Sequence, residues 1–346
     1  MRKARYKGME TLNSTENRFG VFIGGATYTD VVPEIALLSE KMGFDSLWVS
    51  DHMFLPSLFY EAVGISTDKG EYPFLEAWTT MAAVATITKQ IKLGVGVTPI
   101  PLRNPSILAK QVATVDFISN GRVIFGAGAG WHKKEFENYG VSWDSHRVRI
   151  AKMIEGIEVI KKLWTEPFAS YQGKYYKLRE APLWPKPVQK PHPPIWFGGF
   201  STQIINATVK YGQGWVPYCP TADQFKRSFS QIESMARKVG REIEEIEPAC
   251  VVLACIASNQ KEAREIVEPI IKLRGSRSLK PERWEEAEKT GVYGGPDECI
   301  SRIEEYLRAG VKHILFEMIS PKLALKHVKF FGEKIFPYFK EKSSYV

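Results

Sequence analysis

An aspartate and a histidine directly follow a short apolar run, DSLWVS, at residues 45–50. Asp51 and His52 combine an acid with an imidazole, the side chain whose charge changes near neutral pH. Such a pair can hydrogen-bond a cofactor ring, and the imidazole can exchange a proton during hydride transfer. A histidine bonded to backbone at the start of a loop fits the same positions. Position alone therefore leaves a catalytic and a structural interpretation open.

Glycines interrupt the next apolar run, IKLGVGV, at residues 91–97. Near its end stand Val95, Gly96 and Thr98. Glycine at the end of a strand allows close approach to the backbone. That approach is made by a bound ligand or by a tight turn, and the run itself does not decide between them.

A third run, RVIFGA at residues 122–127, continues into a glycine series. Gly128, Gly130 and Trp131 belong to the series GAGAGW, which leaves room for a flat ligand or exposed amides. The series lacks the Lys-Ser/Thr of a phosphate-binding P-loop, so an NTPase is excluded.

A fourth run, PIWFG at residues 194–198, ends in a candidate phosphate site. Phe197, Gly198 and Gly199 lead to Ser201, where a helix is expected to begin. Backbone N–H groups at a helix N-terminus bind anions. A simple strand-to-helix turn with Ser201 as the N-cap is the alternative.

The sequence lacks the residue patterns of several other kinds of site. The six histidines are scattered, with no H-E-x-x-H, and no metal site is predicted. The chain contains no G-x-S-x-G, the hydrolase elbow. Among the four cysteines, Cys250 and Cys255 stand five residues apart in one expected strand and thus on opposite faces. Reduced buried thiols are expected.

Short apolar runs alternate with helical patterns along the whole chain. The remaining runs are FGVFIG (19–24), GWVP (214–217), ACVVLACIA (249–257) and VKHILFE (311–317), which makes eight. They show little alternation, as expected of parallel strands buried on both faces. Amphipathic helices are expected after Asn104-Pro105 and from residue 144 to 164.

Eight strands that alternate with helices predict an α/β fold, a (β/α)8 TIM barrel. An open doubly wound sheet is less suitable, because no G-x-G-x-x-G follows the first strand. We expect a flexible extension at residues 1–17 and a single barrel domain at 18–340. Insertions are expected near 55–72, 165–193 and 273–295, with a hairpin in the second and a mobile loop with a short helix in the third.

Composition excludes several classes. The net charge is +8 and the pI about 9.1, but basic residues are mixed with acids along the helices. No nucleic-acid motif is present, so no nucleic-acid partner is expected. No apolar run of about 18 residues predicts a membrane span, and no secretory signal begins the chain. We expect a cytoplasmic protein.

Four stretches in order resemble the bacterial-luciferase-like family of flavin and deazaflavin oxidoreductases. They are LWVSDH (47–52), residues 93–141 with GAGAGWHKKEF, the helix HRVRIAKMIEGIEVIKKLW (146–164), and KPVQKPHPPIWFGGFS (186–201) with YGQGWVP (211–217). The subgroup with such segments is described as probable coenzyme F-420-dependent oxidoreductases. The resemblance implies a (β/α)8 barrel, commonly dimeric.

The resemblance also implies site residues. It makes Asp51 and His52 cofactor contacts and catalytic groups, and it places a non-proline cis peptide near Val95-Gly96, behind the cofactor ring. The cofactor contacts implied are Asp51, His52, Val95, Gly96, Thr98, Gly128, Gly130, Trp131, Phe197, Gly198, Gly199 and Val216.

Trp131 stands where sugar-phosphate dehydrogenases of the family have a glutamate. With Met53, Phe54 and Leu55, it implies an apolar or aromatic small-molecule substrate. The function expected is hydride transfer between coenzyme F-420, a deazaflavin, and a small organic substrate. An FMN-dependent monooxygenase on the same fold is the alternative. A non-catalytic flavin-binding protein would lack the Asp51–His52 pair.

Overall fold

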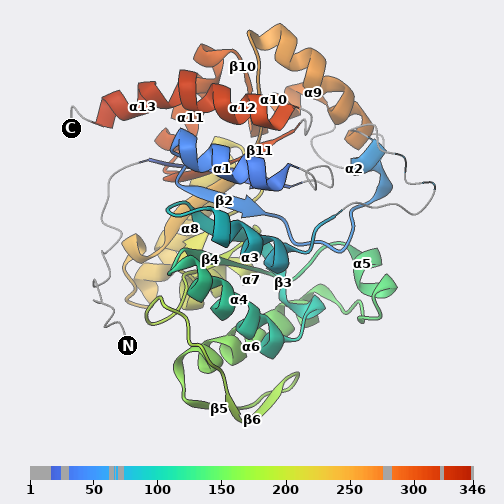
Figure 1. Cartoon of the computed structure of the whole chain (residues 1–346), viewed down its shortest axis with the longest axis vertical. Coiled ribbons are helices and arrows are strands. Elements are labelled where there is room, and N and C mark those ends of the chain that lie inside the picture. The colour runs from blue at the N-terminus through green and yellow to red at the C-terminus, as the bar shows by residue number, and fades with distance from the viewer. Residues whose placement is uncertain are drawn as a thin grey trace.

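The computed structural model describes residues 17–24, 31–61, 66, 68, 74–275, 283–319 and 323–343. Within these ranges, eight parallel strands close into a barrel (Figure 1). In spatial order they are β9 (Glu247–Ile256), β11 (His313–Met318), β1 (Arg18–Ile23), β2 (Ser46–Val49), β3 (Lys92–Pro99), β4 (Val123–Gly128), β7 (Ile195–Phe197) and β8 (Gly214–Trp215). Pairing of β8 with β9 closes the ring. The predicted barrel is confirmed, and each of the eight apolar runs overlaps one of these strands.

Helices follow every barrel strand and cover its outer surface (Figure 1). They are α1 (Val32–Met42), α2 (Ser57–Glu61), α3 (Ala77–Ile87), α4 (Pro105–Ser119), α5 (Lys133–Asn138), α6 (His146–Thr165), α7 (Thr202–Tyr211), α8 (Ala222–Lys238), α9 (Gln260–Gly275), α10 (Trp284–Thr290), α11 (Pro296–Arg308), α12 (Ala324–Phe330) and α13 (Phe336–Ser343). Short helical turns lie at Ile100–Leu102, Ile243–Glu245 and Phe331–Ile335. Where the sequence predicts a cap, Asn104 Oδ1 accepts from the backbone N–H of Ser106 at 2.9 Å.

The insertions differ in what they contain. The second carries the antiparallel hairpin of β5 (Phe168–Gln172) and β6 (Lys177–Pro182), which projects beyond the ring of helices (Figure 1). The prediction of a loop with a short helix at 273–295 was incomplete. Besides α10, this segment contains strand β10 (Gly291–Gly294), which pairs with β9 outside the barrel. Val292 and Tyr293 are buried there, and this burial fixes the added strand.

Parts of three expected segments fall outside the described residues: 1–16 of the extension, most of 62–72 in the first insertion, and 276–282 in the third. In the described ranges, no helix is long and apolar enough to cross a membrane. Cys250, Cys255 and Cys299 are buried free thiols, and Cys219 is half-buried. Cys250 packs in the layer between barrel and helices, whereas Cys255 packs in a separate cluster with Trp284, so the prediction of opposite faces is confirmed.

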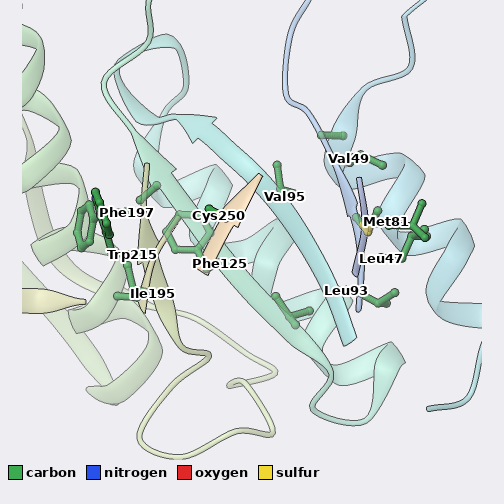
Figure 2. Close-up of a cluster of buried hydrophobic side chains, with 14 of the residues drawn as sticks. Leu47, Val49, Met81, Leu93, Val95, Phe125, Ile195, Phe197, Trp215 and Cys250 are labelled. Atoms are coloured by element: carbon green, nitrogen blue, oxygen red, sulfur yellow. The ribbon is translucent and has the colours of Figure 1, made fainter. Parts of the chain in front are cut away.

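Side chains fill the barrel itself. Phe22, Trp48, Trp196, Val251 and Leu315 belong to the interior cluster, and the ring centroids of Trp48 and Trp196 lie 5.1 Å apart. The larger core lies between the strands and the helices, where Figure 2 shows Val95, Phe125 and Phe197 among the buried side chains. Because the interior is packed, a ligand site must lie at a mouth of the barrel.

Towards the N-terminal mouth, a polar group closes the barrel. His313 is 2% exposed, and its Nε2 lies 2.8 Å from the Ser46 hydroxyl, which also accepts from Trp48 Nε1 at 2.9 Å. Burial lowers the pKa of His313 to about 3. In the outer layer, burial likewise lowers the pKa of His327, which is 1% exposed, to about 4. Both imidazoles are therefore neutral in the folded protein near pH 7.

These two histidines predict that acid weakens the fold. In the unfolded chain an imidazole protonates below about pH 6.5. The contribution of the two neutral histidines to the free energy of unfolding is therefore fully present above that pH and is lost as pH falls towards 4 and 3. At pH 5 each histidine is expected to remove about 2 kcal/mol from the free energy of unfolding, measured by urea titration. In His313→Gln, the decrease in the free energy of unfolding between pH 7 and pH 5 should be smaller than in the wild type by about 2 kcal/mol. The exposed His146→Gln is the control, and an unchanged loss in His313→Gln would contradict the assignment.

Candidate active site

Asp51 lies immediately beyond β2, at the C-terminal mouth of the barrel. The side chain is 2% exposed, and Arg103 donates to it twice, from Nε to Oδ2 at 2.9 Å and from a terminal nitrogen to Oδ1 at 2.5 Å. Arg103 also lies 2.8 Å from Glu76, whose carboxylate caps α3 by accepting from Thr79 N. Burial raises the pKa of Asp51, and Arg103 opposes that rise. This ion-pair network joins the ends of β2 and β3 to the start of α3.

His52 lies at the same mouth of the barrel. Its side chain is 15% exposed, so part of the ring reaches the surface of the site. The Nδ1 atom lies 3.2 Å from Glu135 Oε2, and Glu135 is 1% exposed in α5. The second oxygen, Oε1, accepts from the backbone N–H of Met53. With Nδ1 bonded to the carboxylate, Nε2 is the ring nitrogen left for a ligand.

Aromatic rings surround His52. Phe74 and Trp131 meet the imidazole edge-on, with centroids 5.9 and 5.6 Å away. Trp131 is 52% exposed and stacks on His132 at 5.3 Å, and Phe54 meets His132 at 5.1 Å. Burial lowers the pKa of His132, so this second imidazole is neutral near pH 7. Together these side chains form an apolar rim, here called the aromatic rim.

The end of β3 is irregular, as the resemblance implies. A non-proline cis peptide joins Gly96 to Val97, one bond beyond Val95-Gly96, and the register with β4 shifts between Val95 and Thr98. The Val97 side chain packs with the barrel interior. Residues 96–97 belong to the C-terminal half of β3, on the side of the same mouth.

The glycines at the end of β4 leave space for the irregular end of β3. A Cβ on Gly126 would lie 2.0 Å from the Val95 carbonyl oxygen, and one on Gly128 would lie 2.5 Å from Val97. A Cβ on Gly130 would meet Phe136 at 2.7 Å, and its φ is +79°. Protein atoms thus occupy the space beside these glycines, which the sequence assigned to a flat ligand.

The turn after β7 is open. Gly199 has a φ of +120°, and a Cβ there would have no neighbour nearer than 3.6 Å. Ser201 caps α7, as in the alternative interpretation of this turn, accepting from Ile204 N at 3.3 Å, and Trp215 Nε1 donates to the Gly199 carbonyl at 2.8 Å. The first-turn N–H groups of a helix have no intrahelical partner, so this turn suits an anion.

The structure divides the predicted site residues into two groups. His52, Gly96, Trp131, Gly198 and Gly199 lie at the C-terminal mouth, and Val216 packs with the interior cluster beside it. Val95 and Phe197 face the helices instead (Figure 2). Thr98 is fully buried and accepts from Trp78 Nε1 of α3 at 3.1 Å, so it supports the strand from behind.

Sequence reasoning missed Arg103 and Glu135. Glu135 lies in the segment GWHKKEF that carries the resemblance, but an acid in the first turn of a helix has no distinctive pattern. Arg103 stands in PLRNP just before the α4 cap, where a surface role is equally plausible from the sequence. In the described part of the chain, no three His, Cys, Asp or Glu side chains could together hold a metal ion.

Comparison with known proteins identifies the family. The family model described as luciferase-like monooxygenase matches residues 9–313. The chain belongs to the luciferase-like monooxygenase family. The chain is also similar to the F420-dependent glucose-6-phosphate dehydrogenase of Amycolatopsis mediterranei, which is 27% identical over 303 residues, 82% of this chain and 86% of the relative. The bacterial-luciferase-like resemblance is therefore confirmed.

Two solved structures are similar to this chain over nearly its whole length. An F420-dependent secondary alcohol dehydrogenase, in complex with an F420–acetone adduct, has a TM-score of 0.76 and 25% identity, covering 92% of this chain and 98% of its own. The monooxygenase RslO1 from Streptomyces bottropensis has a TM-score of 0.77 at 22% identity, covering 93% and 99%, and shows the shared fold. The prediction of an oxidoreductase is confirmed.

Proposed function

We propose that this protein is a coenzyme F-420-dependent oxidoreductase that moves a hydride between the cofactor and an apolar or aromatic alcohol or ketone. The observation that carries the proposal is the partly exposed His52 at the C-terminal mouth, bonded through Nδ1 to the buried Glu135. The two relatives described by name as F420-dependent support it.

The residues at the mouth fit a deazaflavin. The open turn at Gly199, before the capped helix α7, offers backbone N–H groups for the phosphate of the cofactor tail. The backbone of the β3 irregularity would lie behind the ring. Such a cofactor, when bound, accepts a hydride from the substrate carbon of an alcohol, or donates one to a ketone.

His52 would handle the accompanying proton. Alcohol oxidation releases the hydroxyl proton as the hydride leaves carbon, and Nε2 of His52 would accept it. In ketone reduction the same atom would return the proton to the oxygen. The aromatic rim would bind the apolar part of the substrate and keep water from the reacting atoms. Asp51, paired with Arg103, would fix the loop that carries His52.

Titration of the purified protein with coenzyme F-420 and with FMN, followed by fluorescence, tests the proposal. We expect tight binding of the deazaflavin and weak binding of FMN. Binding of FMN alone would replace the proposal with a monooxygenase, which oxygen uptake would then examine. Binding of neither would overturn the cofactor site at the mouth.

Trp131 is expected to determine substrate preference. Trp131→Ala should lower kcat/KM for an aromatic secondary alcohol such as 1-phenylethanol by up to about tenfold, because one aromatic contact contributes about 0.5–1.5 kcal/mol. Steady-state assays with 1-phenylethanol and 2-propanol measure the effect, which should be smaller for 2-propanol. Trp184→Ala, at an exposed tryptophan after the β5–β6 hairpin, is the matched control. Equal losses for both alcohols would argue against substrate contact.

We also propose a cytoplasmic homodimer. Ile107, Phe117 and Ile118 project from α4 with exposed fractions of 62%, 58% and 44%. Apolar side chains gathered on one helix support self-association.

A further inference from the structure

We propose that Glu135 is a positioning residue that fixes the tautomer of His52, so that Nε2 is the atom that exchanges the proton. The inference rests on the proposed function for its catalytic meaning, although the tautomer itself is a property of the protein alone.

The two oxygens of Glu135 hold the loop after β2 at two points. Oε2 lies 3.2 Å from His52 Nδ1, and Oε1 accepts from Met53 N. An ionised carboxylate can only accept hydrogen bonds, so the hydrogen must be on Nδ1. The neutral ring then carries its lone pair on Nε2.

Among the charged and titratable groups near His52, Glu135 is the one placed to fix its tautomer. Asp51 is next in the chain, but both of its oxygens accept from Arg103. His132 lies in the same helix region as Glu135, and burial lowers its pKa, so it is neutral near pH 7. Lys134, the residue before Glu135 in α5, interacts with His132. In the described part of the chain, Glu135 is thus the carboxylate that is hydrogen-bonded to His52.

Packing limits the other movements of the ring. Phe74 and Trp131 both meet His52 edge-on, at interplanar angles of 85° and 78°. The ring therefore has two aromatic neighbours, and its Nδ1 is held by the carboxylate. A ring held in one orientation and one tautomer is prepared for proton transfer without reorganisation.

Alcohol oxidation would separate a hydride from a proton. The carbon–hydrogen bond of the alcohol would break with both electrons, and a bound deazaflavin would accept them with the hydrogen as a hydride. The hydroxyl proton passes to Nε2, and the oxygen becomes that of the ketone. His52 becomes an imidazolium with hydrogen on both nitrogens, and the carboxylate of Glu135 stabilises that charge. Ketone reduction is the reverse.

Glu135→Gln tests the role of the carboxylate. The amide oxygen can still accept from Met53 N, but its NH2 group donates to Nδ1 and so moves the ring hydrogen to Nε2. Nitrogen-15 NMR of the histidine side chains measures the tautomer without cofactor, and the chain has six histidines, so the spectrum is simple. We expect hydrogen on Nδ1 in the wild type and on Nε2 in Glu135→Gln, with His52→Gln identifying the signals.

Steady-state kinetics measure the effect of Glu135→Gln on the reaction. We expect kcat of Glu135→Gln to fall by about 10²–10³-fold, with binding of coenzyme F-420 changed by less than about threefold. Glu137→Gln is the matched control: it removes an exposed carboxylate of the same helix, which pairs with Lys133, and should leave the tautomer and kcat unchanged.

Hydrogen on Nε2 in the wild type would overturn the proposal, and so would a kcat of Glu135→Gln within about threefold of the wild type. The wild-type spectrum decides the tautomer even if the variant does not fold. Failure of the wild type to bind coenzyme F-420, with hydrogen still on Nδ1, would instead overturn the proposed function and keep the positioning role of Glu135.

Discussion

Replacing His52 with glutamine is expected to lower kcat for hydride transfer by about 10²–10⁴-fold, the usual contribution of a positioned acid or base. Glutamine can accept a hydrogen bond at the mouth, but it cannot take up the substrate proton near neutral pH. Single-turnover absorbance of coenzyme F-420, mixed with the alcohol, measures the hydride step directly. Binding of the cofactor should change far less than kcat, since the turn at Gly199 and the β3 backbone remain.

His146→Gln provides the control for this substitution. His146 is exposed at the start of α6, away from the interactions described at the mouth. It should leave kcat unchanged. If His52→Gln keeps the wild-type rate at every pH, proton exchange occurs at another group and the structural interpretation of His52 is correct.

Replacing Arg103 with glutamine is expected to lower the free energy of unfolding by about 3–5 kcal/mol, because it leaves a buried charge without its partner. Asp51 is 2% exposed and receives both of its hydrogen bonds from Arg103, so water cannot replace the guanidinium. Urea unfolding at pH 7 measures the loss. Since the pair joins the ends of β2 and β3, the variant should also weaken binding of coenzyme F-420.

Two further variants separate charge from packing. Asp51→Asn combined with Arg103→Gln should be less destabilising than Arg103→Gln alone, because no isolated charge remains buried. Arg308→Gln removes an exposed pair with Glu304 and should cost less than about 1 kcal/mol. A loss in Arg103→Gln no larger than that of Arg308→Gln would show that Asp51 does not depend on the guanidinium.

The sequence by itself determined the fold class and much of its local structure. The eight apolar runs, their lack of alternation and the helices between them were sufficient for a closed parallel barrel. Asn104 and Ser201 identified the starts of α4 and α7, since capping depends on residues close in sequence. The position of His52 after β2 placed it at the C-terminal mouth, because residues that follow a barrel strand lie at its C-terminal end.

Only the tertiary structure decided which side chains support that histidine. Glu135 reaches His52 across 83 residues, and Arg103 reaches Asp51 across 52. Neither contact follows from periodicity, which reports the buried face of an element but not its neighbour across the barrel. The glycines of β4 show the same limit: their sequence suggests room for a ligand, whereas closure of the sheet fills that room with Val95 and Val97. Strand β10 likewise became a strand because β9 offered it an edge to pair with.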